Sequence, residues 1–174
     1  FLWGLGMSVL PFTGVQSKIV TAPVPKQMYY KYHNDDFTVS VRQVGEKEWT
    51  DLYEYKIRVD MDTNSEATMV QFDFSGEVEV RVQLNNGTLR QADIRPLSRG
   101  IRPDVKGNSL QFRLDKPQKL SIECNGDRLH NLHLFAHALE TDVPEEKTPG
   151  VMYFAAGVHE PADAVTRMFR VPSN

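Results

Sequence analysis

A strict alternation of apolar and polar side chains, repeated along most of the chain, is the feature that most constrains the fold. Residues 53–61 place an apolar side chain at every second position, from Tyr53 to Met61. The same pattern recurs in four shorter segments, 37–41, 78–84, 110–114 and 120–124. A period of two gives a strand one buried and one solvated face, which is typical of antiparallel sheets. No window has the 3.6-residue apolar period of an amphipathic helix, so the sequence predicts an all-β protein.

Turn-forming residues separate most of these segments. Asn86-Gly87 and Asn125-Gly126 each follow a strand-like segment. Asn-Gly tolerates the two positive φ angles of a tight hairpin, so we expect the first pair to join 78–84 to 89–94 in a hairpin. Strands about every 10 residues with turns between them predict an antiparallel β-sandwich over residues 28–143.

The first twelve residues, from Phe1 to Phe12, are apolar and carry no charge. They are fewer than the roughly 20 residues that span a bilayer, but they match the apolar core of a secretory signal. We therefore expect residues 1–17 to be a partial signal peptide and residues 18–27 to be a linker. A buried N-terminal strand is the alternative. On the first interpretation the mature protein is secreted or extracellular (periplasmic in a bacterium) and has no membrane contact after cleavage.

The composition changes after the expected sandwich. Residues 142–150 contain two prolines, a glycine and four charged residues, which is typical of a linker. Two apolar segments with strand propensity follow, at 151–154 and 169–171. We expect residues 144–174 to be a linker followed by the start of a second domain.

Aromatic side chains near loops are the candidates for a carbohydrate-binding site, because sugar rings stack on them. We single out Trp49, Tyr30 and Tyr32, whereas Tyr53 and Tyr55 are expected in the core. Asn86 begins an Asn-Gly-Thr sequon and is a possible glycosylation site.

Other kinds of site find little support. A strand would hold His133 and His137 about 13 Å apart, too far to share one zinc ion, so we expect these histidines on polar faces. The single cysteine, Cys124, falls at an inward position and cannot form an internal disulfide. A net charge of -3 does not favour nucleic-acid binding. We expect no catalytic residue, metal or cofactor in this chain.

Three segments in order resemble a known family: DIRPLS at 93–98, VMYFAAGVH at 151–159 and FRVPSN at 169–174. They resemble the N-terminal region of glycoside hydrolase family 49, the dextranases and isopullulanases, and more loosely the polygalacturonase-like enzymes. The resemblance covers roughly residues 29–174. It implies a β-sandwich followed by a right-handed parallel β-helix, of which residues 144–174 would contain the first coil.

The resemblance also implies a function. The chain would be the non-catalytic N-terminal accessory domain of a secreted enzyme that degrades an α-glucan or pectin. The family's catalytic aspartates lie on later coils, so no residue here matches them. The expected partners are the C-terminal β-helix domain of the same chain and possibly a polysaccharide. A carbohydrate-binding module and an adhesion or interaction domain are the alternatives.

Overall fold

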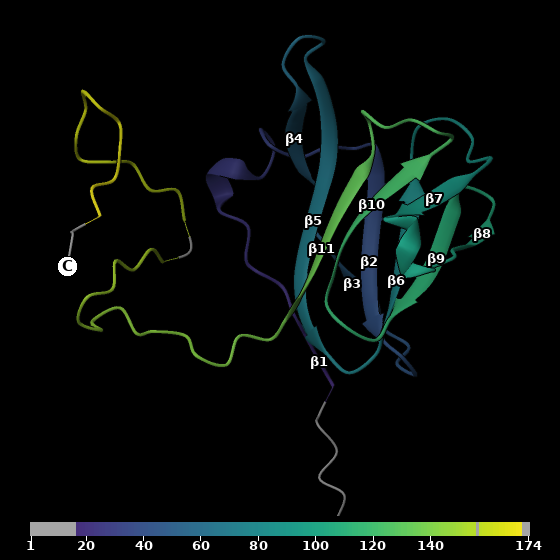
Figure 1. Ribbon diagram of the computed structural model, residues 1–174, viewed down its shortest axis with the longest axis horizontal. Helices are drawn as coiled ribbons and strands as arrows, with labels where there is room; N and C mark the ends of the chain where they lie inside the picture. Colours follow the sequence, from purple (N-terminus) through teal and green to yellow (C-terminus); the bar gives the residue numbers. More distant parts are fainter. Residues whose placement is uncertain (1–16, 156, 172–174) are drawn as a thin grey trace, which may run out of the picture.

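The computed structural model describes residues 17–155 and 157–171, and its eleven strands form two stacked β-sheets (Figure 1). The six-stranded sheet A has the order β1 (Lys18–Val20), β5 (Ser65–Ser75), β11 (Leu132–Ala138), β10 (Gln118–Cys124) and β7 (Ala92–Arg95), with β4 (Tyr55–Asp60) also pairing with β5. The five-stranded sheet B has the order β3 (Thr50–Asp51), β2 (Phe37–Gln43), β6 (Val78–Leu84), β9 (Ser109–Leu114) and β8 (Asp104–Lys106). Two short 3-10 helices, η1 (Lys26–Met28) and η2 (Leu97–Arg99), complete the elements. The all-β prediction is confirmed.

One core lies between the two sheets, and the alternation of the strands accounts for it. The inward positions of β2, β6 and β9 are almost fully buried, as are most of those of β5, β10 and β11, and apart from Gln43, Thr68 and Gln118 the buried ones are apolar. Each large side chain moved out of water contributes about 1.5–3 kcal/mol. The largest buried side chains are Phe37, Phe72, Ile94, Leu110, Ile122, Leu132 and Leu134. Cys124 is buried on β10, as predicted.

The strand pairing departs from the sequence prediction in one strand pair and one turn. β11 runs parallel to β5, whereas every other pair is antiparallel. The expected Asn86-Gly87 hairpin is wrong, because β6 pairs with β2 and β9 in sheet B while β7 lies in sheet A. Residues 85–91 cross between the sheets instead. Asn125 and Gly126, with φ angles of 56° and 79°, do lie in the connection between the antiparallel strands β10 and β11.

The expected strand at 53–61 begins later than its alternation suggests. Residues 52–54 carry the chain from β3 in sheet B to β4 in sheet A, and Leu52 and Glu54 point inward. Tyr53 and Tyr55 are only half-buried, so their assignment to the core is wrong. A segment that crosses between sheets can alternate like a strand. Here the even-numbered residues Leu52 and Glu54 face the core, whereas the alternation suggested the odd-numbered Tyr53 and Tyr55.

The N-terminal part of the described chain belongs to sheet A. β1 pairs antiparallel with β5, from Lys18 opposite Ser75 to Val20 opposite Asp73. The first three residues of the expected linker therefore extend the sandwich. The predicted signal peptide lies outside the described residues, apart from Ser17. Among the described residues no helix is long and apolar enough to cross a bilayer.

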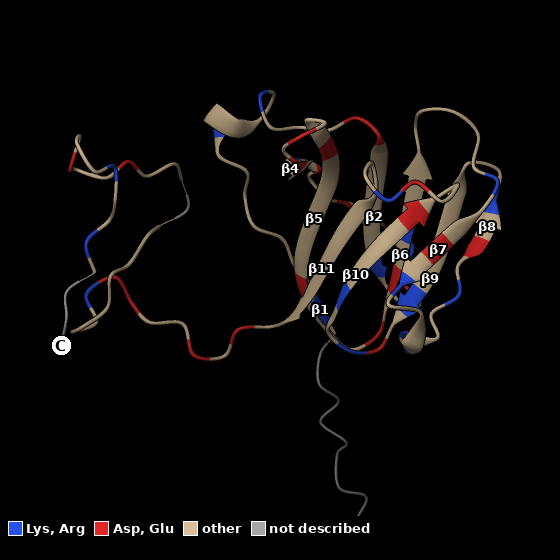
Figure 2. Cartoon of the chain, turned by 45° about the horizontal axis from the view of Figure 1, so that its top comes forward, with Lys and Arg blue, Asp and Glu red and all other residues tan. Residues whose placement is uncertain are grey.

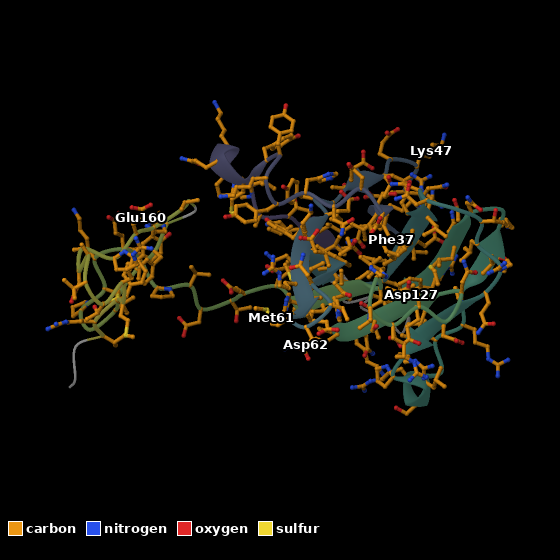
Figure 3. The ribbon with its side chains drawn as sticks, turned by 90° about the horizontal axis from the view of Figure 1, so that it is seen from above. Phe37, Lys47, Met61, Asp62, Asp127 and Glu160 are labelled. Atoms are coloured by element: carbon orange, nitrogen blue, oxygen red, sulfur yellow. The ribbon has the colours of Figure 1, made fainter. Side chains whose placement is uncertain are left out.

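The C-terminal tail leaves β11 and runs away from the sandwich (Figures 1 and 3). Seen from above, Glu160 lies in the tail and Phe37 lies within the sandwich (Figure 3). The described residues of the tail form no strand, so the strands expected at 151–154 and 169–171 are absent and a β-helix start is not confirmed. The rings of Phe154 and Phe169 nevertheless pack edge to face, with centroids 4.9 Å apart.

Candidate functional site

The main candidate site is a hollow of about 510 Å³ beside the segment that crosses between the sheets. One wall comes from the loop that precedes β2, and the other comes from the chain between β3 and β4. We call this hollow the aromatic groove. Its lining combines tyrosine rings with carboxylates and a histidine: Val24, Tyr29, Tyr30, His33, Asp35, Asp51, Leu52, Tyr53 and Glu54.

Tyr53 holds the two walls of the groove together. Its hydroxyl lies 2.8 Å from the Met28 carbonyl and 3.0 Å from the Tyr29 carbonyl, and it donates its one proton to these oxygens at the end of η1. Its ring centroid is 4.6 Å from Tyr55 and 5.2 Å from His33. Burial, followed by the neighbouring tyrosines and Glu54, raises the pKa of Tyr53. The phenol therefore stays protonated at neutral pH and keeps its role as a donor.

Glu54 and His33 form the polar side of the groove. Glu54 Oε1 accepts a hydrogen bond from the Val39 N–H at 2.7 Å, and Oε2 lies 3.2 Å from His33 Nε2. The other ring nitrogen of His33 lies 2.9 Å from Asp35. Burial raises the pKa of Glu54, although the hydrogen bonds from Val39 and His33 oppose the shift. Each ring nitrogen of this histidine therefore faces a carboxylate.

This arrangement is better suited to binding than to bond cleavage. A glycoside hydrolase needs two carboxyl groups flanking the scissile bond, one of them free to donate a proton or attack. Both oxygens of Glu54 are engaged by the protein itself, and Asp35 is held by His33. Asp51 is then the carboxylate of the described lining without an ion pair, so a free pair of carboxyl groups is not formed. Tyr30, by contrast, is 90% exposed and packs edge-on against Tyr29, with ring centroids 5.4 Å apart. An exposed ring beside fixed hydrogen-bonding groups offers a stacking surface for a sugar.

The three predicted sugar-binding residues lie in different places in the structure and do not form one site. Tyr30 lines the groove. Tyr32 lies outside its lining and has the Lys31 ammonium 5.3 Å from its ring centroid. Trp49 packs against two guanidinium groups on the strands of sheet B, with Arg42 and Arg81 4.4 Å and 4.3 Å from its ring centroid. Sequence reasoning missed Tyr53, Glu54 and His33, because a crossing segment brings them together.

The predicted modification site and the histidines are exposed or partly exposed. Asn86 is exposed in the crossing between the sheets, where its amide donates to Asp36 Oδ1 at 2.9 Å. Glycosylation there stays a prediction. His133 and His137 share the outward face of β11, as expected, and His130 pairs with Asp127 in the preceding loop. Within 17–155 and 157–171, no group of three or more His, Cys, Asp or Glu side chains could hold a metal ion.

Comparison with known proteins gives a likeness of fold. No family profile and no curated protein matches the sequence. Among solved structures, the chain is similar to Dex49A from Penicillium minioluteum, with a TM-score of 0.53 and 15% sequence identity. The match covers 73% of this chain and 33% of the Dex49A chain, so this chain spans about a third of that protein. At this identity the comparison shows a shared fold.

Proposed function

We propose that the chain is a non-catalytic accessory domain of a secreted polysaccharide-degrading glycoside hydrolase, similar to the dextranases, with an α-glucan or pectin as substrate. The observation that carries the proposal is the fold likeness to Dex49A, a dextranase of glycoside hydrolase family 49. The three sequence segments resemble the same family. The likeness of the three segments comes from the sequence, and the likeness to Dex49A comes from the backbone. The proposal is supported because both point to the same family.

The proposal includes a β-helix domain after the sandwich as its partner. The tail that would lead into it carries apolar side chains that are poorly covered: Val151, Met152, Tyr153 and Phe154 are 37–47% exposed, and Phe169 is 45% exposed. Side chains of this kind need a further surface to pack against. The coding sequence after Asn174 provides a test. We expect several hundred residues of short repeated strands with paired aspartates, and a stop codon would contradict the proposal.

Catalysis by the chain itself is tested with purified protein. We expect no release of reducing ends from dextran, pullulan or polygalacturonate, because both oxygens of Glu54 are engaged. Hydrolysis that persists through repeated purification would show that the groove, or another site, is catalytic.

Carbohydrate binding in the aromatic groove is the second candidate function, favoured by the exposed ring of Tyr30 beside Glu54 and His33. Native electrophoresis through gels containing dextran or pullulan tests it. Tyr30→Ala should weaken any retardation, because the loss of one stacking ring costs on the order of 1 kcal/mol, or roughly 5-fold in Kd. Tyr32→Ala is the matched control, since Tyr32 is also exposed but lies outside the groove lining. Equal effects of the two variants would dismiss the groove.

A further inference from the structure

The outward face of sheet B is polar and built around arginines. Alternation along β2, β6 and β9 places Arg42, Glu79, Arg81 and Arg113 on this face. Figure 2 colours parts of β6, β8 and β9 blue or red, where these strands carry Lys, Arg, Asp or Glu. The strands hold the backbone of these residues in fixed register, with Arg42 opposite Glu79 and Glu79 opposite Arg113. Three guanidinium groups thus share a rigid surface with Glu79 and with Asp51 of β3, which lies opposite Ser40.

Glu79 pairs with two of the three guanidiniums. Arg42 Nη2 lies 2.6 Å from Glu79 Oε2, and Arg113 Nη2 lies 2.8 Å from Oε1. The hydrogen bonds from Arg42 and then Arg113 lower the pKa of Glu79, so this carboxylate stays charged over the neutral range. Because each of its oxygens already meets a guanidinium, Glu79 is not available to a third arginine.

Arg81 is the arginine without a carboxylate partner. Its Nε donates to the Ser40 hydroxyl at 3.1 Å, and its guanidinium stacks on Trp49. Its cross-strand neighbours are Ser40 on one side and Gln111 on the other, both uncharged. Among the described residues no acidic side chain forms an ion pair with it. The group is therefore fixed in place while its two terminal nitrogens remain available, a geometry that suits bidentate binding of a carboxylate.

A shallow hollow of about 430 Å³ extends the face past Arg113. Its lining includes Arg102, Gln111 and Asp104. Arg102 is exposed and makes no ion pair with any described residue, while Asp104 pairs with Lys106 at 3.0 Å. The lining holds two arginines, Arg102 and Arg113, and two carboxylates, Glu79 and Asp104. Among these described side chains, Arg102 is the charged group without an ion-pair partner.

We propose that this face, defined by Arg42, Trp49, Arg81, Arg102 and Arg113, binds the carboxylate groups of an acidic polysaccharide of the polyuronate type. Arg81 would hold one carboxylate through its terminal nitrogens, and Trp49, whose ring lies against the guanidiniums of Arg42 and Arg81, would keep these two arginines in place. A polymer of regularly spaced carboxylates matches a flat face on which several guanidiniums lie at fixed positions. The inference rests on the proposed role in polysaccharide degradation and narrows its substrate class to acidic polymers, because neutral glucans carry no carboxylate for Arg81.

The experiment compares two forms of one polymer. The 174-residue chain is run in native gels containing polygalacturonate or its fully methyl-esterified form, and Kd is then measured by calorimetry. We expect binding to the acid form, weakened by salt, and little binding to the ester. Arg81→Gln should weaken the Kd by about 10-fold or more, the range for a hydrogen-bonded charge pair. Arg81→Lys should restore part of the affinity, because the charge returns without the planar fork.

Arg58→Gln is the matched control. Arg58 is exposed on β4 of the other sheet, and its substitution removes the same positive charge as Arg81→Gln does. Equal losses from Arg58→Gln and Arg81→Gln would overturn the site, as would equal binding of acid and ester or an absence of binding to polygalacturonate. Equally tight binding of duplex DNA would show that the face binds polyanions in general, and this result would also overturn the proposal. Thermal melts establish that each variant is folded. Binding to neutral glucans through Tyr30 is read separately, so the failure of one proposal leaves the other testable.

Discussion

Removal of the Glu54 carboxylate should destabilise the sandwich measurably. Its Oε1 is the acceptor for the Val39 N–H at 2.7 Å, and Val39 is fully buried in the core. β3 ends at Asp51, so Glu54 takes the place of a strand partner where the chain turns away to the other sheet. In Glu54→Ala the Val39 N–H stays buried and loses its acceptor. His33 also loses one of its two carboxylate neighbours.

The magnitude follows from the cost of an orphaned donor. A buried N–H without a partner costs about 1–3 kcal/mol, so we expect a loss of about 2 kcal/mol. Elements β1 to β11 span about 120 residues, for which the entropy of unfolding is about 0.25 kcal/mol/K. The melting temperature should therefore fall by about 8 °C.

Thermal unfolding followed by far-UV circular dichroism measures this shift. Glu66→Ala is the matched control, because Glu66 pairs with Lys56 at 3.2 Å on a surface where both side chains are more than a third exposed. Such a pair contributes at most about 1 kcal/mol, so the control should melt within about 4 °C of the wild type. The reasoning is refuted if Glu54→Ala melts no lower than Glu66→Ala.

Three further predictions follow from the same structure. Burial raises the pKa of Glu54, so the folded state holds this proton more tightly than the unfolded state, and the carboxyl's contribution to stability declines as the pH rises from the unfolded pKa through the folded one. The stability deficit of Glu54→Gln, measured by urea unfolding, should therefore be smaller at about pH 7 than at about pH 4, and a deficit that grows would contradict the shift. Burial raises the pKa of Cys124 to about 11, so a maleimide should label it only after denaturation, and rapid labelling of the native protein would show β10 to be open. A chain ending at Val143 should melt within about 2 °C of the full chain and be more soluble, because the tail holds no strand and exposes apolar side chains; a much lower melting temperature would mean that the tail is integral to the sandwich.

The sequence was informative where a strand stays in one sheet. β2, β6, β9 and β10 alternate strictly, and all four were predicted. β5 was not, although Val70, Phe72 and Phe74 alternate, because its first half buries Ala67 and Thr68 side by side. The crossings at 52–54 and 85–91 could not be foreseen, since alternation is the same whether or not a chain changes sheets.

The candidate site was predictable to a smaller extent. Tyr30 stood out as an aromatic residue near a loop, and it does line the groove. Glu54 looked like an outward residue of a strand, but its inward orientation depends on the change of sheet. Trp49 was chosen as an aromatic residue near a loop, and its binding of sugar stays a prediction. The arginines against it lie 7 and 32 positions away in sequence, on two strands whose register only the fold defines. The position of a single aromatic residue near a loop can therefore be predicted from the sequence, whereas contacts between residues of distant segments can be found only from the structure.

The position of β11 has a consequence for the order in which the protein can be assembled. β5 with β1 and β4 forms one half of sheet A, β10 with β7 forms the other, and β11 alone joins them. Until β11 has been synthesised, both halves present open edges that can pair with other chains. A nascent chain therefore cannot complete sheet A strand by strand, because β11, its last strand in sequence, has to be inserted between the two halves. Translation pauses or premature stops before residue 132 should release aggregation-prone chains, whereas those after residue 138 should release folded sandwiches.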